Sequence, residues 1–180
     1  MKKINFTRLL VSIIICEVAG AAGSFFTLPA IKTWYAGLNK PGFNPPSWIF
    51  APVWTTLFLL MGVSLYLVWQ KNFTAEKPYS GKIKVWNKLS EKFLARWQKA
   101  NAVLVFSVQL GLNILWSSIF FGLHQPGVAF FELLMLWFAI LYAIINFYRI
   151  SKPAGYLLVP YILWVSFAAL LNFNIWILNI

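Results

Sequence analysis

The chain has 180 residues, of which 61% are hydrophobic and 11% are charged. Soluble globular proteins contain about 45–50% apolar and about 25% charged residues. A soluble chain of this length cannot bury so much apolar surface, whereas a lipid environment requires no such burial. The composition therefore excludes a soluble domain and indicates an integral membrane protein.

Apolar residues occur in blocks long enough to cross a bilayer, which takes ~20 residues at a rise of ~1.5 Å each. The blocks lack the alternation of apolar and polar residues found in membrane β-barrels. Their backbone groups must therefore be satisfied within helices. We predict one all-α domain over residues 1–180, a bundle of five transmembrane helices. The predicted spans are 9–31, 46–70, 101–123, 127–148 and 155–178.

The formal net charge of +11 is distributed unevenly between the two sides of such a bundle. Basic residues precede the first span, crowd the loop 71–99 and separate the last two spans, whereas the opposite side carries Lys32 and Lys40. This positive-inside pattern predicts a cytoplasmic N-terminus and an external C-terminus, and it favours a bacterial plasma membrane. Basic residues so placed suit anionic lipid headgroups, and we expect no nucleic-acid partner.

The N-terminus imitates a signal peptide, because basic residues precede an apolar stretch that ends in small residues. Glu17 interrupts the apolar run, however, and the hydrophobic block continues to Ile31. We therefore expect this segment to be retained as the first span. Gly20 and Gly23 lie on nearly one helical face, which indicates a close approach between helices.

Two connections are long enough to have structure of their own. Residues 34–47 are rich in Pro, Gly and Asn, which predicts a structured loop. Within 71–99, apolar residues recur at helical spacing among lysines: Ile83, Trp86, Leu89, Phe93 and Trp97. Two interpretations stay open, an amphipathic helix on the membrane surface and a stem that extends the third span. Pro52 and Pro160 lie within helical blocks and are candidate kinks.

Catalytic and metal-ligating groups are scarce. The sequence has no Asp, four Glu, one Cys (Cys16) and one His (His124). Metal sites need several convergent ligands, and no phosphate-loop, dinucleotide or Ser-His-acid pattern occurs. We expect no metal, no required cofactor and no hydrolytic chemistry.

Polar and aromatic residues repeat at helical spacing on three spans, at depths where polar groups face the bundle interior. They are Trp54, Phe58, Met61 and Leu65, then Gln109, Asn113 and Trp116, then Trp164, Ala168, Asn172 and Trp176. Taken one at a time, each of these residues is also explained by helix packing or by a hydrogen bond between helices. Together they predict an aromatic-lined cavity with a few polar fixing points, suited to a flat hydrophobic ligand. Glu17 and Glu132 need partners or water.

Four stretches carry long gapped motifs of Trp, Pro and Asn. They are WYAGLNKPGFNPPSW (34–48), FAPVWTTLFLLMGVSLYLVW (50–69), QLGLNILWSSIFFG (109–122) and VPYILWVSFAALLNFNIWILN (159–179). In these stretches the chain closely resembles the translocator protein family, also called tryptophan-rich sensory proteins (TspO/MBR) or peripheral-type benzodiazepine receptors. The resemblance covers about four of the spans and the first loop.

The resemblance implies a five-helix bundle, usually a homodimer, with a pocket between the helices under the first loop. Family members bind porphyrins such as protoporphyrin IX and haem, synthetic isoquinolines and benzodiazepines, and in several cases cholesterol. The ligand-binding residues it implies, together with Gln109 from the helical spacing, are Trp34, Tyr35, Trp54, Gln109, Asn113, Trp116, Trp164 and Ala168. Trp54 and Trp164 match tryptophans that face the ligand in relatives that promote light-dependent porphyrin breakdown, which makes them the candidate catalytic residues. At the proposed sterol motif, Phe173 replaces the expected Tyr and no basic residue follows.

Three functions stay open. The favoured one is a membrane-embedded binding protein that acts as sensor, scavenger or regulator of porphyrins. The others are a transporter of porphyrin or another hydrophobic molecule, including sterol-like ones, and an enzyme that degrades porphyrin by photo-oxidation. No internal repeat supports the alternating-access machinery of a transporter.

Overall fold

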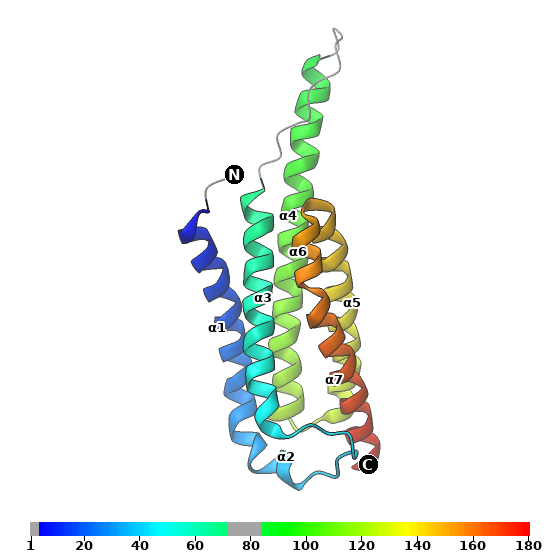
Figure 1. Ribbon diagram of the computed structural model, residues 1–180. Coiled ribbons are helices and arrows are strands. Elements are labelled where there is room, and N and C mark those ends of the chain that lie inside the picture. The colour runs from blue at the N-terminus through cyan, green and yellow to red at the C-terminus, as the bar shows by residue number, and fades with distance from the viewer. Residues whose placement is uncertain (1–3, 72–83) are drawn as a thin grey trace.

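The computed structural model describes residues 4–71 and 84–180, without the side chains of residues 84–92 and 95. Regular structure in this part is helical throughout (Figure 1). The elements are α1 (Phe6–Ile31), α2 (Trp34–Gly37), η1 (Ser47–Ile49), α3 (Phe50–Gln70), α4 (Lys84–Ser117), η2 (Ser118–Gly122), α5 (Pro126–Ile150), α6 (Lys152–Leu157) and α7 (Val159–Leu178). The long helices form one bundle, with the start of α1 and the end of α7 at opposite ends.

The described part of the chain contains five helical segments long and apolar enough to cross a membrane, which confirms the predicted fold class. They are Phe6–Ile31, Ser47–Gln70, Arg96–Gly122, Pro126–Ile150 and Lys152–Leu178. Their ends differ from the predicted ones by a few residues, as helix ends commonly do. Leu158, just before Pro160, separates α6 from α7 in the fifth segment. Proline lacks a backbone N–H, so it fits the first turn of the new helix.

The third span continues into the preceding loop. Helix α4 runs unbroken from Lys84 to Ser117 and rises beyond the ends of the neighbouring helices. Of the five residues that suggested a helix here, Phe93 and Trp97 are exposed; Ile83 and the side chains of Trp86 and Leu89 lie outside the description. The continuous helix matches the stem interpretation rather than a separate helix on the membrane surface.

Helices α1 and α3 pack closely because glycine residues, which have no side chain, let the two backbones approach each other. A Cβ atom on Gly62 would lie 2.6 Å from Cα of Ile13, and one on Gly20 would lie 2.5 Å from the Phe58 ring. On Gly23 it would lie 3.1 Å from Oγ of Ser117 in α4. The predicted role of Gly20 and Gly23 in helix approach is confirmed, and Gly62 is the corresponding residue on the facing helix.

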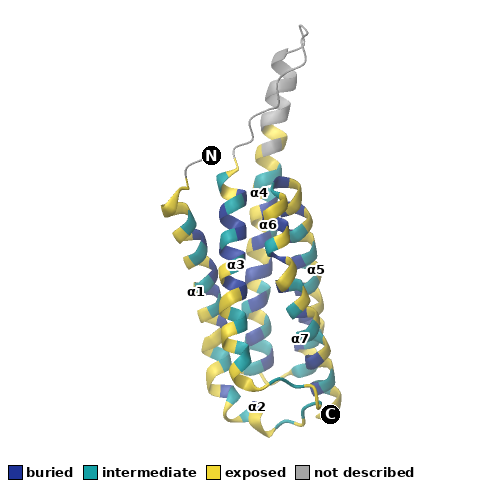
Figure 2. Cartoon of the chain, viewed as in Figure 1, coloured by how far each residue is buried: buried dark blue, intermediate teal, exposed yellow. Residues whose placement is uncertain are grey.

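Buried side chains concentrate in the half of the bundle that contains the start of α1. Figure 2 shows this for α3 and α4, whose buried segments lie mostly in their upper parts. The core cluster there includes Met61, Val68, Phe106 and Phe147, with the rings of Phe106 and Phe147 stacked at 5.1 Å. Ser64 adds a hydrogen bond of 2.7 Å from Oγ to the carbonyl of Ala154. The opposite half, toward α2, is more open.

Replacing Gly62 with Ala tests the close approach of α1 and α3. The added methyl group meets backbone rather than a movable side chain, so we expect the free energy of unfolding to fall by about 1–3 kcal/mol. Gly111→Ala is the matched control, because a Cβ there has nothing within 4 Å. Ala favours helix over Gly by up to about 1 kcal/mol, so the control should unfold at the same or a higher temperature. Thermal unfolding in detergent measures both, and equal losses would contradict the packing argument.

Candidate functional site

The open half of the bundle contains a cavity of about 340 Å³. Small-molecule sites range from about 300 to 1,000 Å³, so this cavity lies at the lower end. Its lining residues farthest from the loop are Glu17 on α1, Phe58 on α3, Asn113 on α4 and Trp164 on α7. From Glu17 to Ile31 the α1 wall is about 21 Å long at 1.5 Å per residue. The cavity therefore extends from mid-membrane to the loop end of the bundle.

Aromatic rings from several helices form part of the wall. The Trp54 ring stacks on Phe58 at 5.7 Å and meets Tyr161 edge-on at 6.3 Å. Phe50 and Trp164 meet edge-on at 6.1 Å, which brings α3 and α7 together across the cavity. Such contacts fix the rings while their remaining faces stay available for stacking.

The amide and indole groups of the wall form hydrogen bonds between helices. Nδ2 of Asn113 donates to the hydroxyl of Tyr161 at 3.2 Å, and Nε1 of Trp116 donates to Oδ1 of Asn172 at 3.1 Å. Nδ2 of Asn172 donates in turn to the carbonyl of Pro126 at 2.7 Å. These bonds join α4, α5 and α7 and orient the amides that line the cavity.

The first loop covers the mouth of the cavity. Figure 1 shows it crossing the end of the bundle to the C-terminal end of α7 and returning to α3. Asn39 and Asn179 fasten it there, with N of Asn39 donating to Oδ1 of Asn179 and Nδ2 of Asn179 donating to the Asn39 carbonyl, each at 2.9 Å. Tyr35 donates its hydroxyl to Oδ1 of Asn44 at 2.8 Å, and Nζ of Lys40 lies 4.9 Å from the Tyr35 ring centre. The predicted structured loop thus holds Tyr35 against the cavity.

The structure brings most of the predicted binding residues to this one cavity: Tyr35, Trp54, Asn113, Trp116, Trp164 and Ala168. Trp34 lies outside the lining, where its ring stacks on His124 at 4.4 Å and meets Phe120 edge-on. Gln109 lies deeper in the bundle core, with Nε2 3.9 Å from Sδ of Met61. Both residues sit next to the cavity wall rather than on its surface.

Two parts of the wall were not predicted. The first is α1, which contributes Glu17, Gly20, Ala21, Gly23, Ser24, Thr27, Leu28 and Ile31. In the sequence this face of α1 is marked by small and hydroxyl residues at three- and four-residue steps rather than by aromatic ones. The second is the π-helical turn η2, which places Phe120 and Phe121 in the wall. Nothing in the sequence pattern marks that turn.

The open side of the cavity is formed by α1, η1 and α3. The exposed lining residues lie on these elements: Ala21, Ser24, Leu28, Ser47, Ala51 and Thr55. Lining residues of α4 and α7, by contrast, are buried or half-buried. Since all of these segments lie at membrane depth or at its edge, a hydrophobic molecule can reach the cavity from the lipid.

Glu132 lies outside the cavity lining. Its side chain is 4% exposed on α5, and neither carboxyl oxygen has a hydrogen-bond partner among the described residues. The partner or water that the sequence analysis expected for Glu132 is therefore not supplied by a described residue. Glu17 makes no ion pair within the described part either, and it faces the cavity.

Helix topology and cavity together define a multi-pass membrane protein with an aromatic-lined internal cavity. The chain belongs to the TspO/MBR family, whose model matches residues 12–177. It is 39% identical to the tryptophan-rich protein TspO of Archaeoglobus fulgidus over 97% of this chain and 99% of that protein. Identity is 40% to the tryptophan-rich protein TspO of Chlorobaculum tepidum, covering 92% and 91% of the two chains. Identity to the human translocator protein is 36%, over 86% of this chain and 79% of that protein.

Titration of Tyr35 tests whether the loop closes the mouth. Burial raises the pKa of the Tyr35 hydroxyl to about 12, although the Asn44 side chain opposes part of the shift. The unfolded chain ionises near pH 10, so the folding stability that Tyr35 contributes is complete below pH 10 and is lost as the pH rises toward 12. We expect the phenolate absorbance of wild type minus Tyr35→Phe to titrate near pH 12. A difference that titrates near pH 10 would show a solvated tyrosine and an open mouth.

Proposed function

We propose that this protein binds porphyrins or similar flat hydrophobic ligands in the membrane and acts as their sensor, scavenger or regulator. The observation that carries the proposal is the convergence of Trp54, Trp116 and Trp164 from three helices on one cavity. Indole faces offer large rigid stacking area, and Asn113 at the inner end can orient a polar edge. No cofactor is needed for this role.

The dimensions of the cavity favour a ligand that enters edge-on. A tetrapyrrole is larger than the enclosed volume of about 340 Å³, so part of the ring must extend through the open side formed by α1, η1 and α3. Several of the residues that line this side are small or carry a hydroxyl group: Ala21, Ser24, Ala51 and Thr55. A flat ring passes between such residues more easily than a bulky one.

A photo-oxidative activity is the second candidate, because both candidate catalytic tryptophans line the same cavity. An excited porphyrin in the cavity would lie beside Trp54 and Trp164, whose indoles can donate an electron, and dissolved O₂ would be the oxidant that opens the porphyrin ring. The activity requires a light-dependent product that forms faster with protein than in its absence.

Titration with protoporphyrin IX in the dark tests the binding function. The detergent-purified protein should bind saturably, followed by the change in porphyrin absorbance and by quenching of tryptophan fluorescence. The double variant Trp54→Phe, Trp164→Phe should bind about tenfold more weakly, since about 0.7 kcal/mol is lost per reduced stacking contact. Repeating the titration under light, with product analysis, tests the photo-oxidative candidate.

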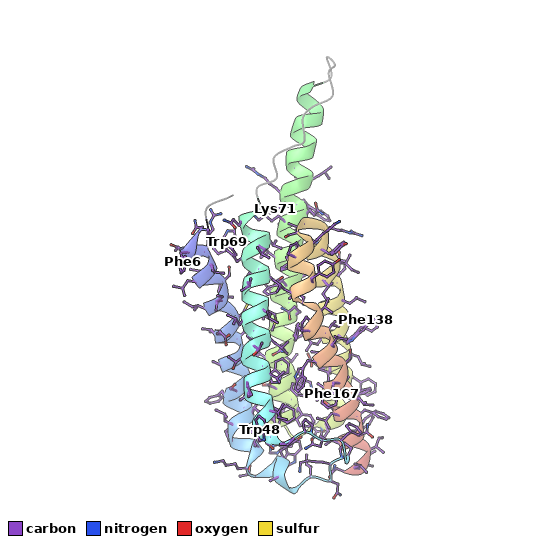
Figure 3. The ribbon with its side chains drawn as sticks, in the orientation of Figure 1. Phe6, Trp48, Trp69, Lys71, Phe138 and Phe167 are labelled. Atoms are coloured by element: carbon purple, nitrogen blue, oxygen red, sulfur yellow. The ribbon has the colours of Figure 1, made fainter. Side chains whose placement is uncertain are left out.

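The matched control is Trp69→Phe, Trp137→Phe, which changes two tryptophans outside the lining. Figure 3 labels Trp69 at the end of α3 opposite the cavity. Nε1 of Trp137 donates to Ser166 on the far side of α7 from the cavity lining. We expect this variant to bind like wild type. Absence of saturable binding by wild type, or equal weakening in both variants, would overturn the proposed function.

We further propose that the end of the bundle carrying Arg8 and Lys71 faces the cytoplasm of a bacterial cell and that the loop end faces outside. The charge asymmetry supports this orientation. In a Cys16→Ser background, an impermeant thiol reagent should label Gly42→Cys on intact cells but label Lys71→Cys only after lysis. Figure 3 shows Lys71 at the end opposite the loop that contains Gly42. The reverse labelling pattern would contradict the orientation.

A further inference from the structure

The inner end of the cavity carries a carboxyl group at mid-membrane. Glu17 is eleven residues into α1, about 16 Å along a helix that crosses a hydrocarbon core of about 30 Å. It lines the cavity at the level of Phe58 on α3 and Asn113 on α4. Carboxyl groups at this depth are costly and are retained where they have a function.

No other described residue neutralises this carboxyl. Glu17 has neither a hydrogen bond nor an ion pair within the described part of the chain, and the neighbour with which it interacts electrostatically is the Cys16 thiol. Among the described residues that line the cavity, Glu17 and Tyr35 are the ionisable ones, and none is basic. In its ionised form this carboxyl offers acceptor oxygens and repels negative charge.

Near the mouth of the cavity the charged side chains are positive. Lys40 lies against the ring of Tyr35, with Nζ also donating to the carbonyls of Ala36 and Leu38 at 3.2 and 2.9 Å. Lys32 follows directly after α1 and is exposed. A ligand in this cavity therefore meets a carboxyl at its inner edge, whereas the ammonium group of Lys40 lies against Tyr35, a lining residue at the outer end.

We infer that Glu17 is a specificity-determining residue that excludes anionic groups from the inner end and so makes a carboxylate-bearing ligand bind with its carboxylates toward the mouth. The inference rests on the proposed function, because it concerns the orientation of a ligand in the same cavity. Placing a ligand carboxylate beside the ionised Glu17 would bring like charges together at a place where the described lining residues supply no cation, and specificity built on such repulsion is effective.

Porphyrins that differ in the placement of their carboxylates test the inference. Protoporphyrin IX has both propionates on one edge and can point them outward. A porphyrin with a propionate on each of its four pyrrole rings must direct at least one inward. Wild type should therefore bind protoporphyrin IX more tightly than the porphyrin with four propionates. In Glu17→Gln the ratio of the two affinities should fall by about tenfold, because the porphyrin with four propionates binds better. The methyl esters of both porphyrins, which have no charge, should show the same affinity ratio in both proteins.

Glu132→Gln is the matched control, because it removes a buried carboxyl from α5 without changing the cavity lining. In this variant the ratio of the affinities for the two porphyrins should equal that of wild type. If wild type binds both porphyrins equally, or if Glu17→Gln leaves the preference unchanged, the inference about Glu17 is wrong although the proposed function stands. If wild type binds neither porphyrin saturably, the proposed function itself is wrong.

Discussion

A polar side chain in hydrocarbon finds no water, so its hydrogen-bond partner has to come from another part of the protein. Here the amide of Asn172 joins α7 to Trp116 of α4 and to the backbone at the start of α5. Asn113 likewise reaches Tyr161 from α4. Each bond adds only about 0.6–2 kcal/mol, but together they fix which faces of α4 and α7 meet. The position of the cavity follows from these pairings.

The same pairings explain why the loop half of the bundle is not filled. Near the start of α1, glycine brings α1 and α3 into backbone contact and large side chains fill the remaining space. Toward the loop, α7 packs on α5 and is linked to α3 and α4 through aromatic edges and amides. Aromatic rings that meet edge-on keep the helices apart, and the flat faces of these rings stay uncovered. The loop then closes this end through the hydrogen bonds between Asn39 and Asn179 and through apolar contacts such as that of Phe43 with Phe167.

Much of this arrangement could be predicted because membrane helices carry a strong signal. Length and hydropathy located the spans, and the four-residue spacing of Trp164, Ala168 and Asn172 identified the face that lines the cavity. The contribution of α1 was missed because glycine, alanine and serine line a cavity by leaving space, which residue size rather than aromatic spacing reveals. The π-helical turn η2, which contains the buried Phe120, has no signal in the sequence pattern and could not be predicted. Gln109 was grouped correctly on its helix but lies one turn too deep to reach the cavity surface.

Glu17 and Glu132, the glutamates whose side chains the structure describes, differ in what their positions allow them to do. Glu132 is enclosed by α5 and its neighbours, so whatever satisfies its oxygens must already lie inside the protein. Glu17 is at similar membrane depth but opens onto the cavity, where the satisfying group can be a ligand. An enclosed carboxyl affects mainly stability, because its surroundings are the same with or without ligand. A carboxyl on the cavity wall changes its surroundings whenever a ligand enters, and only such a group can select between ligands.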